Sequence, residues 1–189
     1  MNRFDKQFAT HNGPLLRDSM LSLQINVGRK CNQACRHCHV DAAPWRTESL
    51  NHETASRICE WIKAHRPQTV DITGGAPELN DNFREIVKTA HNSGCETIDR
   101  CNLTILLEKG FEWVPTFLTS HEVVIIASLP CYRPENVNRQ RGNGVFNQSI
   151  RALQKLNSLG YGTTIPLHLV HNPIGASLPP PQSKLEADY

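Results

Sequence analysis

Three cysteines in one short loop constrain this chain more than any other feature. Cys31, Cys35 and Cys38 follow an apolar run at residues 21–27, with the spacing C-x3-C-x2-C. Three thiols within eight residues are too close together for all of them to join a disulfide framework in a globular chain. Such spacing is typical of metal ligands, so the sequence predicts a metal centre early in the chain.

Two kinds of metal centre fit a trio of thiolates. A structural zinc ion takes four protein ligands, and His39 could complete such a site, although the remaining cysteines are scattered singly and offer no second pair. A [4Fe–4S] cluster takes one thiolate per iron, so three cysteines leave one iron without a protein ligand. Both interpretations stay open at this point, and the open iron of the second suggests a reactive centre.

Composition places limits on the class of protein. The chain has 189 residues, of which 39% are hydrophobic and 20% charged, and its net charge is +2. This length suits one domain with a buried core. So small a charge gives no indication of nucleic acid or a membrane as partner, and no apolar run approaches the roughly 20 residues of a membrane span. An odd number of cysteines without an export signal fits a reducing compartment, so we expect a cytoplasmic protein.

Apolar strand-like runs alternate with amphipathic stretches along the chain. Helices are expected from Asn51 as N-cap, around residues 83–90 with Gly94 as the stop, in a broken form at 103–118, and at 147–159. The expected strands are residues 21–27, 69–73, 96–100, 123–128 and 164–170. This alternation predicts an α/β fold with a parallel sheet and right-handed crossovers. In such sheets chemistry collects at the carboxyl ends of the strands.

The two ends of the chain differ from this pattern. We expect residues 1–20 to form an N-terminal arm that covers the domain, 21–173 the core domain, and 174–189 a proline-rich tail. Pro166 lies within the fifth expected strand and lacks the N–H that a central strand must donate. This strand is therefore expected at an exposed edge of the sheet, or covered by a partner.

The cysteine spacing and its place after the first strand resemble the radical S-adenosylmethionine (radical SAM) superfamily. The resemblance implies an open, partial (β/α) barrel, here of about five parallel strands. It also implies a [4Fe–4S] cluster whose open iron binds the amino and carboxylate groups of S-adenosylmethionine. In that superfamily the reduced cluster breaks the C5′–S bond to give a 5′-deoxyadenosyl radical, with electrons from a donor such as a flavodoxin or ferredoxin.

Further segments resemble the arsenosugar-biosynthesis radical SAM protein family. They are residues 71–80 (DITGGAPELN), 99–104 (DRCNLT), 128–132 (SLPCY), 140–142 (QRG) and 169–173 (LVHNP). The resemblance implies transfer of the 5′-deoxyadenosyl group to a small dimethylarsenic substrate. Relatives normally add a sixth strand and a C-terminal domain, so by this resemblance the chain is expected to be truncated. A cluster-binding fragment without full activity, or a non-catalytic zinc-stabilised binding domain, are the alternatives.

The resemblance also assigns roles to residues after the other strands. His37 precedes the third cysteine, where an aromatic ring usually stacks on adenine. Gly74, Gly75 and Pro77 match the glycine motif, where bare backbone approaches the methionyl ammonium; Ala76 replaces a common acidic residue, which leaves the ammonium to backbone carbonyls or to Glu78. The remaining candidates for binding S-adenosylmethionine are Asn102, Ser128, Arg141 and Asn172.

Cys101 and Cys131 are candidates for binding the arsenical. Each follows an expected strand end on the active face, whereas Cys59 and Cys95 occupy positions typical of a core. Thiolates are soft ligands and trivalent arsenic is a soft acceptor, so thiolates should bind it as they bind soft metals. The hypothesis is that one or both hold dimethylated arsenic near C5′ of the adenosyl group.

Overall fold

Five parallel strands in one sheet organise the chain. The structure is a computed structural model, and it describes residues 2–13, 18–176 and 178–189. The strands are β1 (Ser22–Asn26), β2 (Thr69–Thr73), β3 (Glu96–Asp99), β4 (Val124–Ala127) and β5 (Leu167–Leu169). They lie in the order β1-β2-β3-β4-β5, each parallel to the next. The predicted α/β class with five parallel strands is confirmed.

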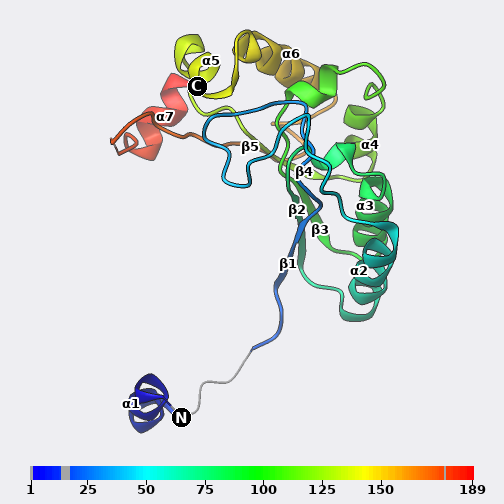
Figure 1. The fold of residues 1–189 in the computed structure, drawn as a ribbon, viewed down its shortest axis with the longest axis vertical. Helices are drawn as coiled ribbons and strands as arrows, with labels where there is room; N and C mark the ends of the chain where they lie inside the picture. The colour runs from blue at the N-terminus through cyan, green and yellow to red at the C-terminus, as the bar shows by residue number, and fades with distance from the viewer. Residues whose placement is uncertain (1, 14–17, 177) are drawn as a thin grey trace.

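Helices between the strands cover one face of this sheet (Figure 1). They are α2 (His52–His65), α3 (Phe83–Asn92), α4 (Val114–Ser120) and α6 (Val145–Asn157), with 3-10 turns η1 (Pro77–Leu79) and η2 (Thr104–Leu107). The predicted cap of α2 is confirmed, because the Asn51 side chain accepts a hydrogen bond from the Thr54 N–H at 2.9 Å. Gly94 follows α3 with φ +77°, the left-handed conformation expected of a glycine stop.

The two faces of the sheet differ along β2. On β2, Val70 and Ile72 are fully buried toward the helices, where they meet side chains such as Ile62 and Ile86. The intervening Asp71 points to the other face. That face is the inside of the partial barrel, and its polar side chains mark where a ligand can approach.

The sheet ends at β5 as the sequence predicted. Strand β5 begins at Leu167 instead of residue 164, because Pro166 has no N–H to donate to the neighbouring strand. The Pro166 carbonyl still accepts a hydrogen bond from the Ile125 N–H. It is an edge strand with Leu169 and Val170 exposed by 36% and 43%. Helix α7 (Gln182–Asp188) then folds back, and the Tyr189 hydroxyl donates to the Leu129 carbonyl at 2.7 Å.

Two further helices were not predicted. Helix α5 (Pro134–Arg141) is strongly polar and has no apolar period, although Pro134 at its first position is a start signal. Helix α1 (Arg3–Asn12) carries an Asn2–Asp5 capping box and lies apart from the sheet in Figure 1. Part of the predicted arm, residues 14–17, and residue 177 of the predicted tail fall outside the described residues. Among the helices that are described, none is both long and apolar enough to cross a membrane.

Candidate functional site

A pocket of about 260 Å³ lies where the strands end, as the sequence predicted. All three motif cysteines line it. Cys31, Cys35 and Cys38 come from the loop after β1, and residues after β2, β3 and β4 form the opposite walls. The other predicted residues that line this pocket are His37, Gly74, Gly75, Asn102, Ser128 and Arg141. Segments far apart in the sequence therefore meet at one site.

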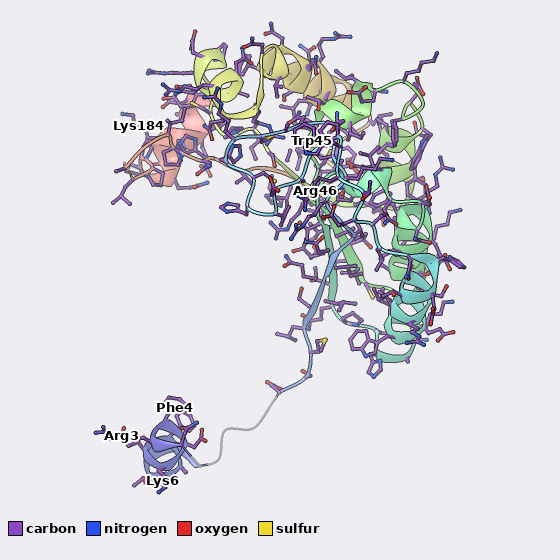
Figure 2. All side chains as sticks on the ribbon, viewed as in Figure 1. Arg3, Phe4, Lys6, Trp45, Arg46 and Lys184 are labelled. Carbon is purple, nitrogen blue, oxygen red and sulfur yellow. The ribbon has the colours of Figure 1, made fainter. Side chains whose placement is uncertain are left out.

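The cysteine loop is held on both sides by its own backbone. Cys31 N–H donates to the Ala43 carbonyl at 3.3 Å, and Ala43 N–H donates to the Arg29 carbonyl at 3.1 Å. Beyond the cysteines, Arg46 pairs with Asp41 at 2.8 Å and also with Glu48, in the part of the loop labelled in Figure 2. These contacts tie the start of the cysteine loop to the segment that follows it.

Hydrogen-bond donors converge on the sulfur atoms. Cys31 Sγ accepts from the Gln33 N–H and from Asn102 Nδ2, both at 3.4 Å, and Cys38 Sγ accepts from the Ala42 N–H at 3.2 Å. Burial raises the pKa of the Cys31 and Cys35 thiols, and the nearby Arg141 guanidinium acts in the opposite direction. The donors to Cys31 and the Arg141 cation favour the thiolate, the form that binds metal, against the larger effect of burial, whereas Cys35 Sγ donates to Gln33 Oε1 at 3.2 Å.

The spacing of these donor atoms separates the two kinds of metal centre. Ligands of one zinc ion lie about 2.0 to 2.3 Å from it, so they lie within roughly 4 Å of one another. Among the described residues, neither the cysteine trio nor a set that includes His39 brings three donor atoms within 4.8 Å of one another. Thiolates that each bind a different iron of a cluster are farther apart. The donor set therefore fits a [4Fe–4S] cluster better than a single zinc ion.

The glycine turn after β2 packs directly on the cysteine loop. Gly75 N–H donates to the Gly28 carbonyl and Ala76 N–H to the Lys30 carbonyl, each at 2.9 Å. A Cβ on Gly74 would lie 2.7 Å from the Gly28 carbonyl oxygen, and one on Gly75 would collide with the Lys30 carbonyl. Glycine is thus needed at these two positions mainly because two backbone segments touch there. The sequence did not reveal this contact.

Arg141 is a buried cation at the pocket wall. Its side chain is 6% exposed, it makes no ion pair within the described part of the chain, and its Nε has no hydrogen-bond partner there. A buried guanidinium without an anion is costly. Together with the thiols nearby, this predicts an anionic ligand. Burial, and then Arg141, lower the pKa of His37, so this ring is neutral and suited to stacking.

Asn102 joins the end of β3 to the cysteine loop. Besides Cys31 Sγ, its Nδ2 donates to Asn32 Oδ1 at 2.7 Å. The next residue, Leu103, has φ +67° and ψ −47°, and Thr104 N–H donates to the Asn102 carbonyl at 2.9 Å. This is a γ-turn of the strained hand. Strain of this kind persists where surrounding contacts over-determine it, often at functional sites.

Arg100 was missed in the sequence. It lines the pocket, and its Nε and Nη2 each donate to Asp71 at 2.8 Å. Gln24 Nε2 donates to the same carboxylate at 2.8 Å. A lone aspartate inside an apolar strand was the signal that could have found it, because a buried carboxylate needs a partner. Thr73, Gln33 and the apolar Val40, Ile126 and Val170 also line the pocket.

Four predicted site residues do not line this pocket. Cys101 is fully buried beside Glu78 and Asp99, and Cys131 is buried beside Asn136, whose Nδ2 lies 3.4 Å from its sulfur. Pro77 begins η1 and is buried. Asn172 donates its N–H to the Pro130 carbonyl at 2.9 Å, and its side chain lies at Gln140. Glu78, considered for the methionyl ammonium, is 3% exposed and does not line the pocket either, although its charge acts on the Cys31 thiol.

Comparison with known proteins agrees with this geometry. The family model described as the Radical SAM superfamily matches residues 25–173. A probable GTP 3′,8-cyclase of Methanothermobacter marburgensis is 29% identical over 92 residues, 49% of this chain and 30% of its own length. The mycofactocin maturase MftC of Mycolicibacterium smegmatis is 26% identical over 147 residues, 76% of this chain and 36% of its own. The chain thus spans about a third of these relatives.

Solved structures share the fold. Streptococcus suis SuiB bound to S-adenosylmethionine has a TM-score of 0.65 and 17% identity, over 87% of this chain and 36% of that chain. A second structure, anSMEcpe with bound AdoMet, has a TM-score of 0.63 and 17% identity, over 80% of this chain and 43% of that chain. At these identities the similarity concerns the fold alone.

Proposed function

Because the chain belongs to the radical SAM superfamily, an enzyme family that uses a [4Fe–4S] cluster and S-adenosylmethionine, we propose that Cys31, Cys35 and Cys38 hold the cluster. S-adenosylmethionine then occupies the iron that lacks a protein ligand. This assignment is supported by the pocket that the three thiols and the glycine turn line together. The three sulfur atoms in it lie too far apart to bind a single ion. When bound, these groups supply a 5′-deoxyadenosyl group.

The chain's own residues bind and orient the nucleotide. Arg141, buried and without an acidic partner in the described chain, pairs with the methionyl carboxylate through a charge-assisted hydrogen bond. The neutral His37 ring stacks on the adenine, and Ser128 offers a hydroxyl at the opposite wall. The Gly74–Gly75 turn leaves backbone carbonyls open to the ammonium, because Glu78 is buried elsewhere.

The acceptor is a dimethylarsenic species, as the resemblance of residues 71–80, 99–104 and 128–132 to arsenosugar-biosynthesis proteins implies. Apolar side chains in the pocket, Val40, Ile126 and Val170, suit the methyl groups. Cys101 and Cys131 have no part in this proposal, since neither lines the pocket. Electrons come from an acidic carrier such as a flavodoxin or ferredoxin, because Arg29, Lys30 and Arg36 are exposed around the cysteine loop.

A second candidate is a maturation reaction on an extended acceptor. The match to a mycofactocin maturase over most of the chain favours it. So does the exposed β5 edge, whose unpaired backbone groups could bind an extended segment as an added strand.

One reaction tests the first candidate. The protein is reconstituted anaerobically with iron and sulfide, reduced, and given S-adenosylmethionine and dimethylarsinous acid. We expect a dimethylarsinoyl-adenosine by mass spectrometry, absent without reductant and absent in Cys38→Ala. Formation of 5′-deoxyadenosine without an arsenic product would contradict the arsenical acceptor. A complete cluster that cleaves no S-adenosylmethionine would contradict the enzyme.

A further inference from the structure

A second group of potential metal ligands lies on the helix-covered side of the sheet. Glu78 in η1, Asp99 at the end of β3 and Cys101 two residues later place their donor atoms within 4.8 Å of one another. Within the part of the chain that the structure describes, this is the one group of three such side chains that converges so closely. None of the three lines the cofactor pocket.

These carboxyl groups are buried without partners outside the group. Glu78 is 3% exposed and Asp99 0%, and none of the four carboxyl oxygens accepts a hydrogen bond from a described residue outside the group. In the sheet Asp99 lies between Ile72 of β2 and Ile125 of β4. A buried carboxylate normally recruits N–H donors or a cation, since an unpaired charge in a buried site is costly.

The electrostatic surroundings of the group are negative. Burial first, and then the neighbouring Glu78 and Asp71, raise the pKa of Asp99 well above its usual value. Burial, Glu78 and Asp99 likewise raise the pKa of the Cys101 thiol. Arg100, the residue after Asp99, is committed to Asp71 on the opposite face. Either bound protons or a bound cation must therefore neutralise the group.

The donor set favours the cation. Bound protons would let the two carboxyl groups share a proton and the Cys101 thiol donate to Glu78, which satisfies the atoms in pairs, whereas a single cation satisfies all three side chains at once. A sulfur with two carboxylate oxygens is instead a ligand set that zinc accepts. Cys101 Sγ also receives the Leu103 N–H at 3.3 Å, two residues on, as Cys31 Sγ receives the Gln33 N–H. Such donors hold a thiolate in the orientation that a metal requires.

We propose that Glu78, Asp99 and Cys101 bind one divalent cation of borderline softness, best satisfied by zinc. Binding forms one M–S and two M–O bonds and displaces to solvent the thiol proton and any proton held by the carboxyl pair, with no redox change. The ion joins η1 to the end of β3 directly behind Asn102, whose side chain contacts Cys31. It therefore stabilises the wall of the cofactor pocket, and the proposal does not depend on which substrate that pocket takes.

Metal analysis tests this site separately from the cluster. A Cys31→Ser/Cys35→Ser/Cys38→Ser variant lacks the cluster ligands and is incubated with zinc, then dialysed. We expect about one zinc per chain in this variant, and the same zinc beside the iron in the reconstituted wild type. Asp99→Asn and Cys101→Ser, added singly, should each reduce zinc at least about tenfold, whereas Cys59→Ser, at another buried cysteine, should not.

Cobalt gives a second readout that needs no further substitution. Cobalt bound to the cluster-free variant should show a thiolate charge-transfer band, which Cys101→Ser removes. A cluster-free variant that folds, binds no zinc and shows no such band would overturn the proposal. Full zinc retention in both Asp99→Asn and Cys101→Ser would overturn it as well.

Discussion

Cys31 and Cys101 lie at the same end of one sheet, after β1 and after β3, yet they face different surroundings. The thiol of Cys31 lies in a pocket between loops, next to two more cysteines and the Arg141 cation. The thiol of Cys101 lies under the helices, next to two carboxyl groups. Under the two proposals, the same residue type at the same level of a fold would serve an open centre in one place and a closed one in the other. The charge of the neighbouring groups and the access of ligands to the thiol decide which kind of centre can form.

Removing a cluster ligand should have the largest effect. In Cys35→Ala we expect reconstituted iron and S-adenosylmethionine cleavage to fall to background, because no other thiol in the pocket can replace it. Iron analysis and assay of 5′-deoxyadenosine check this. Cys59→Ala removes a buried thiol outside the pocket and should retain both. Equal losses of iron and of S-adenosylmethionine cleavage in the two variants would contradict a role specific to the cysteines of the pocket.

Closing the space at the glycine turn should have the next largest effect. In Gly75→Ala the new Cβ meets the Lys30 carbonyl, and backbone on both sides must shift. We expect a loss of about 1 to 3 kcal/mol in the free energy of unfolding and incomplete cluster loading. Denaturant titration with iron analysis measures both. Gly110→Ala is the control for strain without a collision: alanine is strained at φ +90°, but nothing lies within 4 Å of its Cβ position. It should lose stability and still load the cluster; loading as poor there would contradict a role specific to the turn.

Removing the buried cation should affect binding more than turnover. In Arg141→Gln the KM for S-adenosylmethionine should rise about tenfold with a smaller change in kcat, since a charge-assisted hydrogen bond is lost. Arg139→Gln, on the exposed side of the same helix, is the control. Steady-state kinetics at several S-adenosylmethionine concentrations separates the two constants. An unchanged KM would show that the carboxylate binds elsewhere.

The Glu78–Asp99–Cys101 group should change how the stability of the protein depends on pH. Because the folded-state pKa of Asp99 is raised, the metal-free folded protein holds a proton that the unfolded chain releases above about pH 4. Its stability is therefore full below that pH and declines as pH rises toward the folded pKa. Asp99→Asn should weaken this decline in denaturant titrations with chelator. Added zinc should reverse this decline in stability in the wild type only, because the metal competes with protons for the same side chains. An identical pH profile in the wild type and in Asp99→Asn would contradict the assignment of the decline to Asp99.

The sequence predicted the elements whose signals are local. Strand β2 matches its predicted bounds, Asn51 caps α2, and Pro166 shortens β5 and leaves it at an edge. The cysteine spacing predicted the loop, and the strand ends predicted the pocket. Helix α5 was missed because its eight residues are almost all polar, so they carry no apolar period.

What the sequence could not supply was the direction of each side chain after a strand. Cys101 lies two residues beyond the end of β3, on the side of Asp99, whereas Ser128 lies one residue beyond the end of β4 and lines the pocket. The alternation of side chains continues past the end of a strand, so the register between neighbouring strands, which the sequence alone does not define, decides the face. The same limit applies to Arg100, whose ion pair with Asp71 depends on the register of β2 with β3.

The most direct test concerns the iron that three protein thiolates would leave without a ligand. Wild-type protein is reconstituted anaerobically and reduced, and its electron paramagnetic resonance spectrum is recorded before and after addition of S-adenosylmethionine. We predict about four iron and four sulfide per chain and a cluster signal that changes when the nucleotide binds, with no such change in Arg141→Gln at low nucleotide concentration. A reconstituted cluster whose signal is indifferent to saturating S-adenosylmethionine, or a loop that retains zinc in place of iron, would contradict the account.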